Sequence, residues 1–157
     1  MSTEPEVVPG EKVTIAFEAH RCIHSRYCVL TRPDVFVPNV QGEWIHPDAA
    51  SAEAVTALAH NCPSGAITYQ RHDGGPQEEA PVVNLIRVRE NGPLAFHAEL
   101  EIEGQEPRLR ATLCRCGASK SKPFCDGSHN AIAFSATGEP ATVESTVLPV
   151  RNGKLTV

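Results

Sequence analysis

The chain has 157 residues, with 14 lysines and arginines against 19 aspartates and glutamates, a net charge of −5. This length suits one ordinary domain or two small ones, and an acidic chain without a basic run lacks the electrostatic surface of a nucleic-acid-binding protein. No apolar run approaches the roughly 18 residues of a membrane span, and we expect no signal peptide. The six cysteines therefore indicate metal binding in a reducing compartment, the cytoplasm, in preference to disulfides.

Two strands and one helix are predicted in the first half of the chain. Apolar residues alternate over 13–17, as in a strand with one buried face. A helix is predicted to begin after Asp48 or Ser51, either of which can cap it, and to end before Pro63. A second strand over 67–70 would pair with the first.

Three cysteines lie in the turns between these elements. Cys22 and Cys28 bracket the loop after the first strand, and Cys62 follows the helix. This order resembles the mono-cluster bacterial ferredoxins, and the resemblance implies a small α+β domain whose three cysteines bind an iron–sulfur cluster. The residues that carry the resemblance are Cys22, Cys28, the run Pro33-Asp34-Val35-Phe36, and Cys62-Pro63 with Gly65 and Ala66.

The fourth ligand of this cluster is left open by the sequence. A four-cysteine ferredoxin would have a further cysteine where this chain has Ser25. Cys22, Cys28 and Cys62 would then hold a 3Fe-4S cluster, or a 4Fe-4S cluster completed by His24, Ser25 or solvent. His24 is the best candidate among the other side chains, and hydrogen bonding to the backbone or to a sulfide is its alternative role.

A boundary and a second, mostly β half follow. The stretch 71–81 is rich in glycine, proline and charge, which indicates a linker, so we divide the chain into domains 1–75 and 76–157. Two strands over 82–89 and 96–102 form a predicted hairpin. Further strands are predicted over 109–113, 142–150 and 154–157. The whole chain is therefore predicted to be α+β, a small ferredoxin-like module followed by a mostly β module.

The densest group of metal ligands lies in the second half, as C-x-C, eight residues, and C-x-x-x-H. Thiolates and a neutral imidazole suit zinc or an iron–sulfur cluster. The run 114–129 resembles the signature of the CDGSH iron–sulfur family, the mitoNEET type, which binds a 2Fe-2S cluster. The resemblance implies that Cys114 and Cys116 hold one iron, and that Cys125 and His129 hold the other. A structural zinc site is the alternative.

The two motifs together predict a soluble two-cluster iron–sulfur protein that carries single electrons to or from a redox partner protein. We find no catalytic triad, phosphate loop or dinucleotide fingerprint, so an enzyme is not expected. The alternative function is cluster transfer to an acceptor protein, or redox and pH sensing, by a labile histidine-held cluster. No nucleic-acid or membrane partner is expected. The resemblance to the mitoNEET type also implies a homodimer, which the extra N-terminal domain would have to accommodate.

Overall fold

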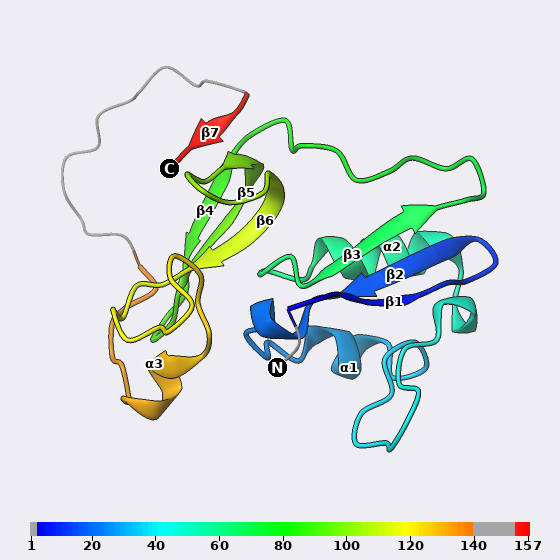
Figure 1. The fold of residues 1–157 in the computed structure, drawn as a ribbon, viewed down its shortest axis with the longest axis horizontal. Coiled ribbons are helices and arrows are strands. Elements are labelled where there is room, and N and C mark those ends of the chain that lie inside the picture. Colours follow the sequence, from blue (N-terminus) through cyan, green and yellow to red (C-terminus); the bar gives the residue numbers. More distant parts are fainter. Residues whose placement is uncertain (1–2, 140–152) are drawn as a thin grey trace. The chain divides into compact units, whose positions relative to one another are not determined.

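The computed structural model describes residues 3–139 and 153–157, so the strand predicted over 142–150 lies outside the described residues. The chain divides into two compact units, Met1–Glu79 and Ala80–Val157. The first unit combines helices with a small sheet and the second is mostly β (Figure 1). The α+β prediction is confirmed. No helix in the described parts of the chain is long and apolar enough to cross a membrane.

The first unit contains a three-stranded antiparallel sheet in the order β1-β2-β3. Its strands are β1 (Glu6–Val8), β2 (Val13–Phe17) and β3 (Ile67–Arg71). β2 and β3 confirm the two predicted strands and their pairing, with Phe17 opposite Ile67. The three-residue strand β1 was not predicted, because so short a segment has too few residues for an alternating pattern to be recognised.

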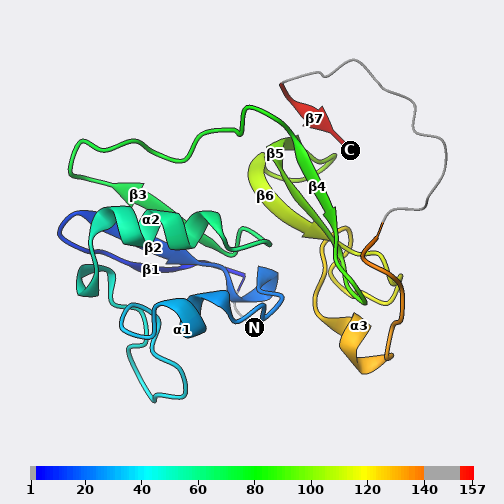
Figure 2. The same ribbon diagram turned by 180° about the vertical axis from the view of Figure 1, so that it is seen from behind.

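Helix α2 lies across one face of this sheet, as the two opposite views show (Figures 1 and 2). The unit's helical segments are η1 (Ala19–Arg21), α1 (Tyr27–Thr31), η2 (Pro47–Ala49) and α2 (Ala52–His60). Ser51 caps α2, because its Oγ accepts a hydrogen bond from the amide of Ala54 at 3.2 Å. Both the capping residue and the end of this helix before Pro63 are as predicted.

The core of the first unit lies between α2 and the sheet. Its buried residues are Val13, Ile15, Val35, Phe36, Ile45, Val55, Leu58, Ala59 and Ile67. Val35 and Phe36 are fully buried, so the Pro-Asp-Val-Phe run serves packing. The Trp44 ring packs edge-on against Phe17, with 4.9 Å between ring centroids. This core fixes the elements from which the cysteine loops depart.

The second unit is a small sheet with one short helix. Antiparallel strands β4 (Leu85–Val88), β5 (Leu94–Glu101) and β6 (Arg108–Leu113) follow one another, and β7 (Leu155–Thr156) runs parallel to β5. The predicted hairpin and third strand are confirmed. Helix α3 (Ser128–Ala131) follows a long loop after β6. The core residues are Phe96, Ala98, Leu100, Ile102, Ala111 and Phe124.

Candidate metal centres

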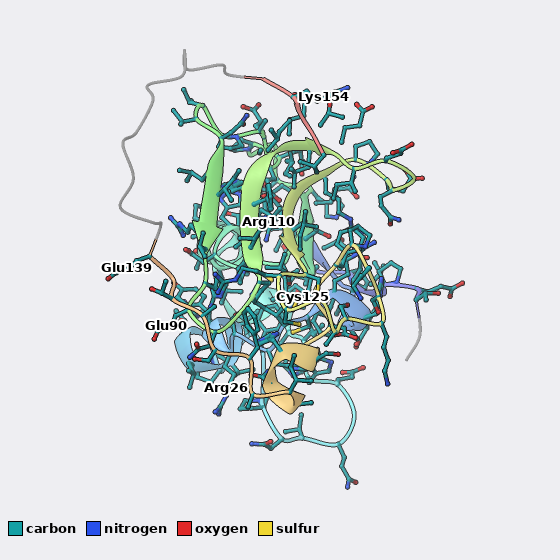
Figure 3. All side chains as sticks on the ribbon, turned by 90° about the vertical axis from the view of Figure 1, so that its left-hand side faces the viewer. Arg26, Glu90, Arg110, Cys125, Glu139 and Lys154 are labelled. Atoms are coloured by element: carbon teal, nitrogen blue, oxygen red, sulfur yellow. The ribbon has the colours of Figure 1, made fainter. Side chains whose placement is uncertain are left out.

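The end of β6 brings two C-terminal cysteines together through backbone pairing. The amide of Cys114 donates to the carbonyl of Pro123 at 2.9 Å, and the amide of Cys125 donates to the carbonyl of Thr112 at 2.9 Å. Phe124, which lies between Pro123 and Cys125 in the sequence, is buried in the core of the unit. The loop is thereby closed back onto the strand from which it leaves. Figure 3 shows Cys125 near the end of the sheet, close to α3.

The four predicted C-terminal ligands form two donor pairs. Cys114 Sγ and Cys116 Sγ lie 3.9 Å apart, and Cys125 Sγ and His129 Nδ1 lie 3.4 Å apart. Two ligands of one tetrahedral metal, bonded at about 2.0–2.3 Å, lie roughly 3.3–3.8 Å apart. The distances in both pairs are within or close to this range, so each pair could bind one metal ion.

The two pairs do not merge into a site for a single ion. They line one narrow cleft, together with Gly92 and Pro93. Among residues 3–139 and 153–157, no three cysteine, histidine, aspartate or glutamate side chains are arranged to hold one metal ion. A single structural zinc needs four ligands around one point. Each donor pair could hold one metal atom of a group that contains two.

His129 reaches this space because the chain turns sharply after Cys125. Gly127 has φ of +86° at the start of α3, a left-handed conformation that a residue with a Cβ adopts only with strain. The short helix then places His129 one turn beyond Cys125. Its Nδ1 atom, and not Nε2, faces the Cys125 sulfur. The helix itself was not predicted, because four residues show no helical period.

Hydrogen bonds from and to side chains hold the loop between the two donor pairs. The Ser119 hydroxyl is buried and donates to the carbonyl of Phe124 at 2.6 Å. Asp126 accepts from the amides of Lys120 at 2.9 Å and Ser128 at 3.0 Å. Hydrogen bonds from Ser128 and Lys120 lower the pKa of Asp126 to about 2. The sequence does not reveal the role of Ser119, because an isolated serine carries no sequence signal.

The thiols of this site differ in how readily they ionise. Burial raises the pKa of Cys125 despite the amide of Gly127, which donates to its sulfur at 3.4 Å. Burial also acts to raise the pKa of Cys114, but hydrogen bonds from the backbone and the charge of Lys122 outweigh it, and the pKa is lowered. Cys114 is therefore better prepared to bind metal as a thiolate.

Arg115, between the first two cysteines, connects the loop with two other segments. Its guanidinium donates to the carbonyl oxygens of Arg89 at 2.7 Å, Gly92 at 2.9 Å and Thr137 at 3.1 Å. It also lies over the ring of Phe134, 5.3 Å from the centroid. The sequence does not reveal this role, because hydrogen bonds to backbone carbonyls do not depend on the residue types that supply them.

The three N-terminal cysteines converge on one cavity of the first unit. Cys22 follows η1, Cys28 lies in the first turn of α1, and Cys62 follows α2. All three line a cavity of about 420 Å³, together with apolar side chains from β2, α2 and the loop before Trp44. Burial raises the pKa values of Cys22 and Cys28, and the charge of Cys62 raises them further. The three thiols are therefore close enough to influence one another.

His24 and Ser25 also line this cavity. The backbone amide of His24 donates to the Cys22 sulfur at 3.3 Å, and His24 Nδ1 lies 3.9 Å from the same sulfur. Positive φ values at His24 and Arg26 produce this tight turn. His24 thus contacts Cys22 itself, a placement that suits its alternative role as a hydrogen-bond partner.

Two further histidines of the first unit have ordinary hydrogen-bond partners. His60 Nε2 lies 2.8 Å from the hydroxyl of Tyr69, and His72 Nε2 lies 2.7 Å from the hydroxyl of Thr14. Trp44 and Tyr69 pack against the hydrophobic core. Tyr27 instead is 40% exposed.

Comparisons with known proteins match both units. The family model described as a divergent 4Fe-4S mono-cluster matches residues 8–72, and the one described as an iron-binding zinc finger of CDGSH type matches residues 86–130. No solved structure matches significantly.

Relatives of each unit are found separately. CDGSH iron-sulfur domain-containing protein 1 of Rattus norvegicus is 33% identical over 91 residues, which are 57% of this chain and 73% of the relative. The same protein of Bos taurus is 33% identical over 92 residues, 58% of this chain and 76% of the relative. The protein YjdI of Escherichia coli K12 is 36% identical over 62 residues, 39% of this chain and 79% of the relative. The chain is an iron–sulfur-binding protein that belongs to the CDGSH iron–sulfur family and carries a divergent mono-cluster ferredoxin-like domain before its CDGSH domain.

Proposed function

We propose that the protein is a two-cluster carrier of single electrons. The observation that carries this proposal is that each unit gathers its own set of three cysteines, around a cavity in the first unit and around a narrow cleft in the second. When bound, an iron–sulfur cluster accepts and gives up one electron at a time. The families found for both units support a cluster-binding role.

In the second unit, we assign Cys114 and Cys116 to one iron and Cys125 and His129 to the other iron of a 2Fe-2S cluster. The distances within the two donor pairs support this assignment. The amides of Ala118 and Gly127 donate to the sulfurs of Cys116 and Cys125, both at 3.4 Å. These donors stabilise the negative charge of the ligands.

In the first unit, we assign Cys22, Cys28 and Cys62 to a second cluster, of 3Fe-4S or 4Fe-4S type. The cavity that these residues line supports the assignment, because it leaves room for a group larger than one ion. Ser25 stands at the position of the further cysteine of a four-cysteine ferredoxin and also lines the cavity. A fourth iron would be completed by Ser25, His24 or solvent.

The experiment that tests the proposal measures iron, sulfide and zinc in protein purified without oxygen, with EPR spectra before and after reduction. We expect about five to six irons per chain, a reduced 2Fe-2S signal, and either an oxidised 3Fe-4S or a reduced 4Fe-4S signal. Stoichiometric zinc with a colourless second unit would contradict it. Two irons without any second signal would leave the first unit as a docking module.

A second function is favoured by the placement of His129. This ligand lies on a four-residue helix, partly exposed, and it is the neutral member of its donor set. Such a ligand is lost more easily than a buried thiolate. Transfer of this cluster to an acceptor, or pH and redox sensing, would follow. Transfer requires that an apo-acceptor protein remove the cluster faster than buffer alone does.

A further inference from the structure

We infer that the mouth of the N-terminal cysteine cavity is a docking surface for an acidic redox protein, with Arg26 as its charged contact. The inference rests on the proposed electron-carrier function, since a partner must then approach the cysteine-lined cavity closely. It concerns the first unit alone.

The rim of this cavity exposes apolar side chains. Tyr27 is 40% exposed and Val40 is 46% exposed, and both line the cavity. Leu30 is 69% exposed and lies one helical turn after Tyr27 on α1. Exposed apolar groups that gather at one opening, with a polar surround, are typical of an interaction site.

The charge around this opening differs from the charge of the unit as a whole. Residues 1–79 contain five lysines and arginines against eleven aspartates and glutamates. The residues that line the cavity include Arg26 and no aspartate or glutamate. Arg26 is exposed beside α1 (Figure 3), and it forms no ion pair with a carboxylate in the described part of the chain.

Three carboxylates adjoin the cavity-lining segments in the sequence, and two of them are already bound by other arginines. Glu18 is bound by Arg21 at 3.2 Å, and the guanidinium of Arg32 is bound to Asp34. Glu43 lies exposed on the loop before Trp44 but does not line the cavity. An apolar rim with one uncompensated cation fits a partner whose own apolar contact area is bordered by carboxylates. A basic partner would instead be drawn to the acidic remainder of the unit.

The test compares the reaction of the fully reduced protein with two oxidants of opposite charge. One electron passes from the protein to each probe, and it reduces hexacyanoferrate(III) to hexacyanoferrate(II) or hexaammineruthenium(III) to hexaammineruthenium(II). Arg26→Glu is compared with Lys12→Glu, which makes the same charge change at the other end of β2 from Phe17, a cavity-lining residue. Rapid-mixing kinetics at low ionic strength give the rate constants, and freeze-quench EPR assigns them to the N-terminal site.

We expect Arg26→Glu to slow the reaction with the anionic probe about tenfold and to accelerate that with the cationic probe, whereas Lys12→Glu changes either rate less than about twofold. Glu43→Gln removes a negative charge from the loop before Trp44, and it should modestly increase the rate constant for the reaction with the anionic probe. Equal effects of Arg26→Glu and Lys12→Glu would overturn the docking surface while leaving the carrier function intact. A protein that cannot be reduced and reoxidised reversibly would overturn both.

The apolar rim is tested with anthraquinone-2,6-disulfonate, a flat aromatic acceptor with two negative groups. Val40→Ser removes a cavity-lining side chain that is exposed and lies on a loop, so the fold should tolerate it. We expect this variant to raise the quinone concentration that half-saturates the rate about threefold, with no change in the reaction with hexacyanoferrate. Unchanged quinone kinetics in Val40→Ser would overturn the apolar part of the surface.

Discussion

The guanidinium of Arg115 is bound to the carbonyl oxygen of Gly92, with 2.9 Å between Nε and the oxygen. Its other nitrogens reach the carbonyls of Arg89 and Thr137. Arg115 lies between two cysteines that we assign as ligands, so this contact joins the cluster loop to the turn between β4 and β5. The amide of Asn91 in that turn also donates to the carbonyl of Ala136, at 2.8 Å. Three separate segments therefore meet at one side chain.

Replacement of Arg115 by alanine should loosen the second unit. Three carbonyls lose a charged donor, which we expect to cost about 2 kcal/mol in the free energy of unfolding and to shorten the lifetime of the visible cluster absorbance several-fold. Arg115→Lys should recover only part of the loss, because an ammonium cannot span the three acceptors. Arg87→Ala, on exposed β4, is the matched control. Equal absorbance lifetimes in Arg115→Ala and Arg87→Ala would contradict the role of Arg115.

Replacement of His129 by cysteine tests the neutral ligand. A thiolate carries a charge that imidazole lacks, so the reduction potential of the second unit should fall by roughly 100–300 mV. The imidazole also has a second nitrogen that can exchange a proton on reduction, so the wild-type potential should decrease with rising pH by up to about 59 mV per unit. The variant should lose most of this dependence.

Spectroelectrochemical titration between pH 6 and pH 9 measures both effects. Since Nδ1 faces the Cys125 sulfur, a cysteine at position 129 can bring its sulfur near the same point. A wild-type potential that does not vary across this range would contradict the assignment of His129.

Replacement of Asp126 by asparagine should destabilise the cluster loop. The effect on the rate of cluster loss should be the same at every pH near neutrality. The folded-state pKa of Asp126 is about 2, below the ordinary value of roughly 3.9, so its contribution to stability is complete above about pH 4 and is lost as the pH falls toward 2. Asparagine keeps one acceptor oxygen for the amides of Lys120 and Ser128, and cluster loss should accelerate.

The rates of cluster loss from wild type and Asp126→Asn should therefore stay in a constant ratio from pH 5 to pH 8. In His129→Cys, by contrast, the acceleration of loss toward acid should itself diminish, because protons no longer compete with iron for the imidazole. A ratio that changes steeply between pH 5 and pH 8 would show that Asp126 titrates there after all.

Replacement of Ser51 by alanine should destabilise the first unit by about 1 kcal/mol, because the amide of Ala54 loses its side-chain acceptor. Ser51→Asp should restore the stability, since a carboxylate also caps a helix and interacts favourably with its N-terminus. Denaturant unfolding followed at the N-terminal cluster absorbance measures the change. Cys62 lies two residues after the end of α2. If Ser51→Ala does not change the unfolding midpoint, then α2 does not limit the stability of the site.

The sequence predicted the elements whose patterns are long or chemically specific. Val13, Ile15 and Phe17 alternate clearly enough to define β2, and Ser51 with Pro63 brackets α2. The ligand motifs combine rare residue types at fixed spacing, so the families of both units could be identified from residues alone.

The sequence did not predict the features that depend on tertiary contacts. The five residues of α1 begin after Arg26, which has φ of +63°, a conformation that propensity does not anticipate for arginine. The hydroxyl of Ser119 and the guanidinium of Arg115 donate to backbone carbonyls. Every residue type has such a carbonyl, so the sequence does not identify these acceptors. The position of His24 beside Cys22, too, follows from the fold of its loop.

Replacement of Ser25 by cysteine should give the first unit a complete set of four thiolates. Ser25 lines the same cavity as Cys22, Cys28 and Cys62, so a thiolate there can reach a metal group bound to the other three. Anaerobically reconstituted Ser25→Cys should show four irons at this site and a reduced 4Fe-4S EPR signal that survives exposure to oxygen longer than in wild type. His24→Ala should leave the iron count unchanged, because His24 Nδ1 lies 3.9 Å from the Cys22 sulfur and contacts a ligand that is already in place. Loss of one iron in His24→Ala, with no gain in Ser25→Cys, would instead identify His24 as the fourth ligand.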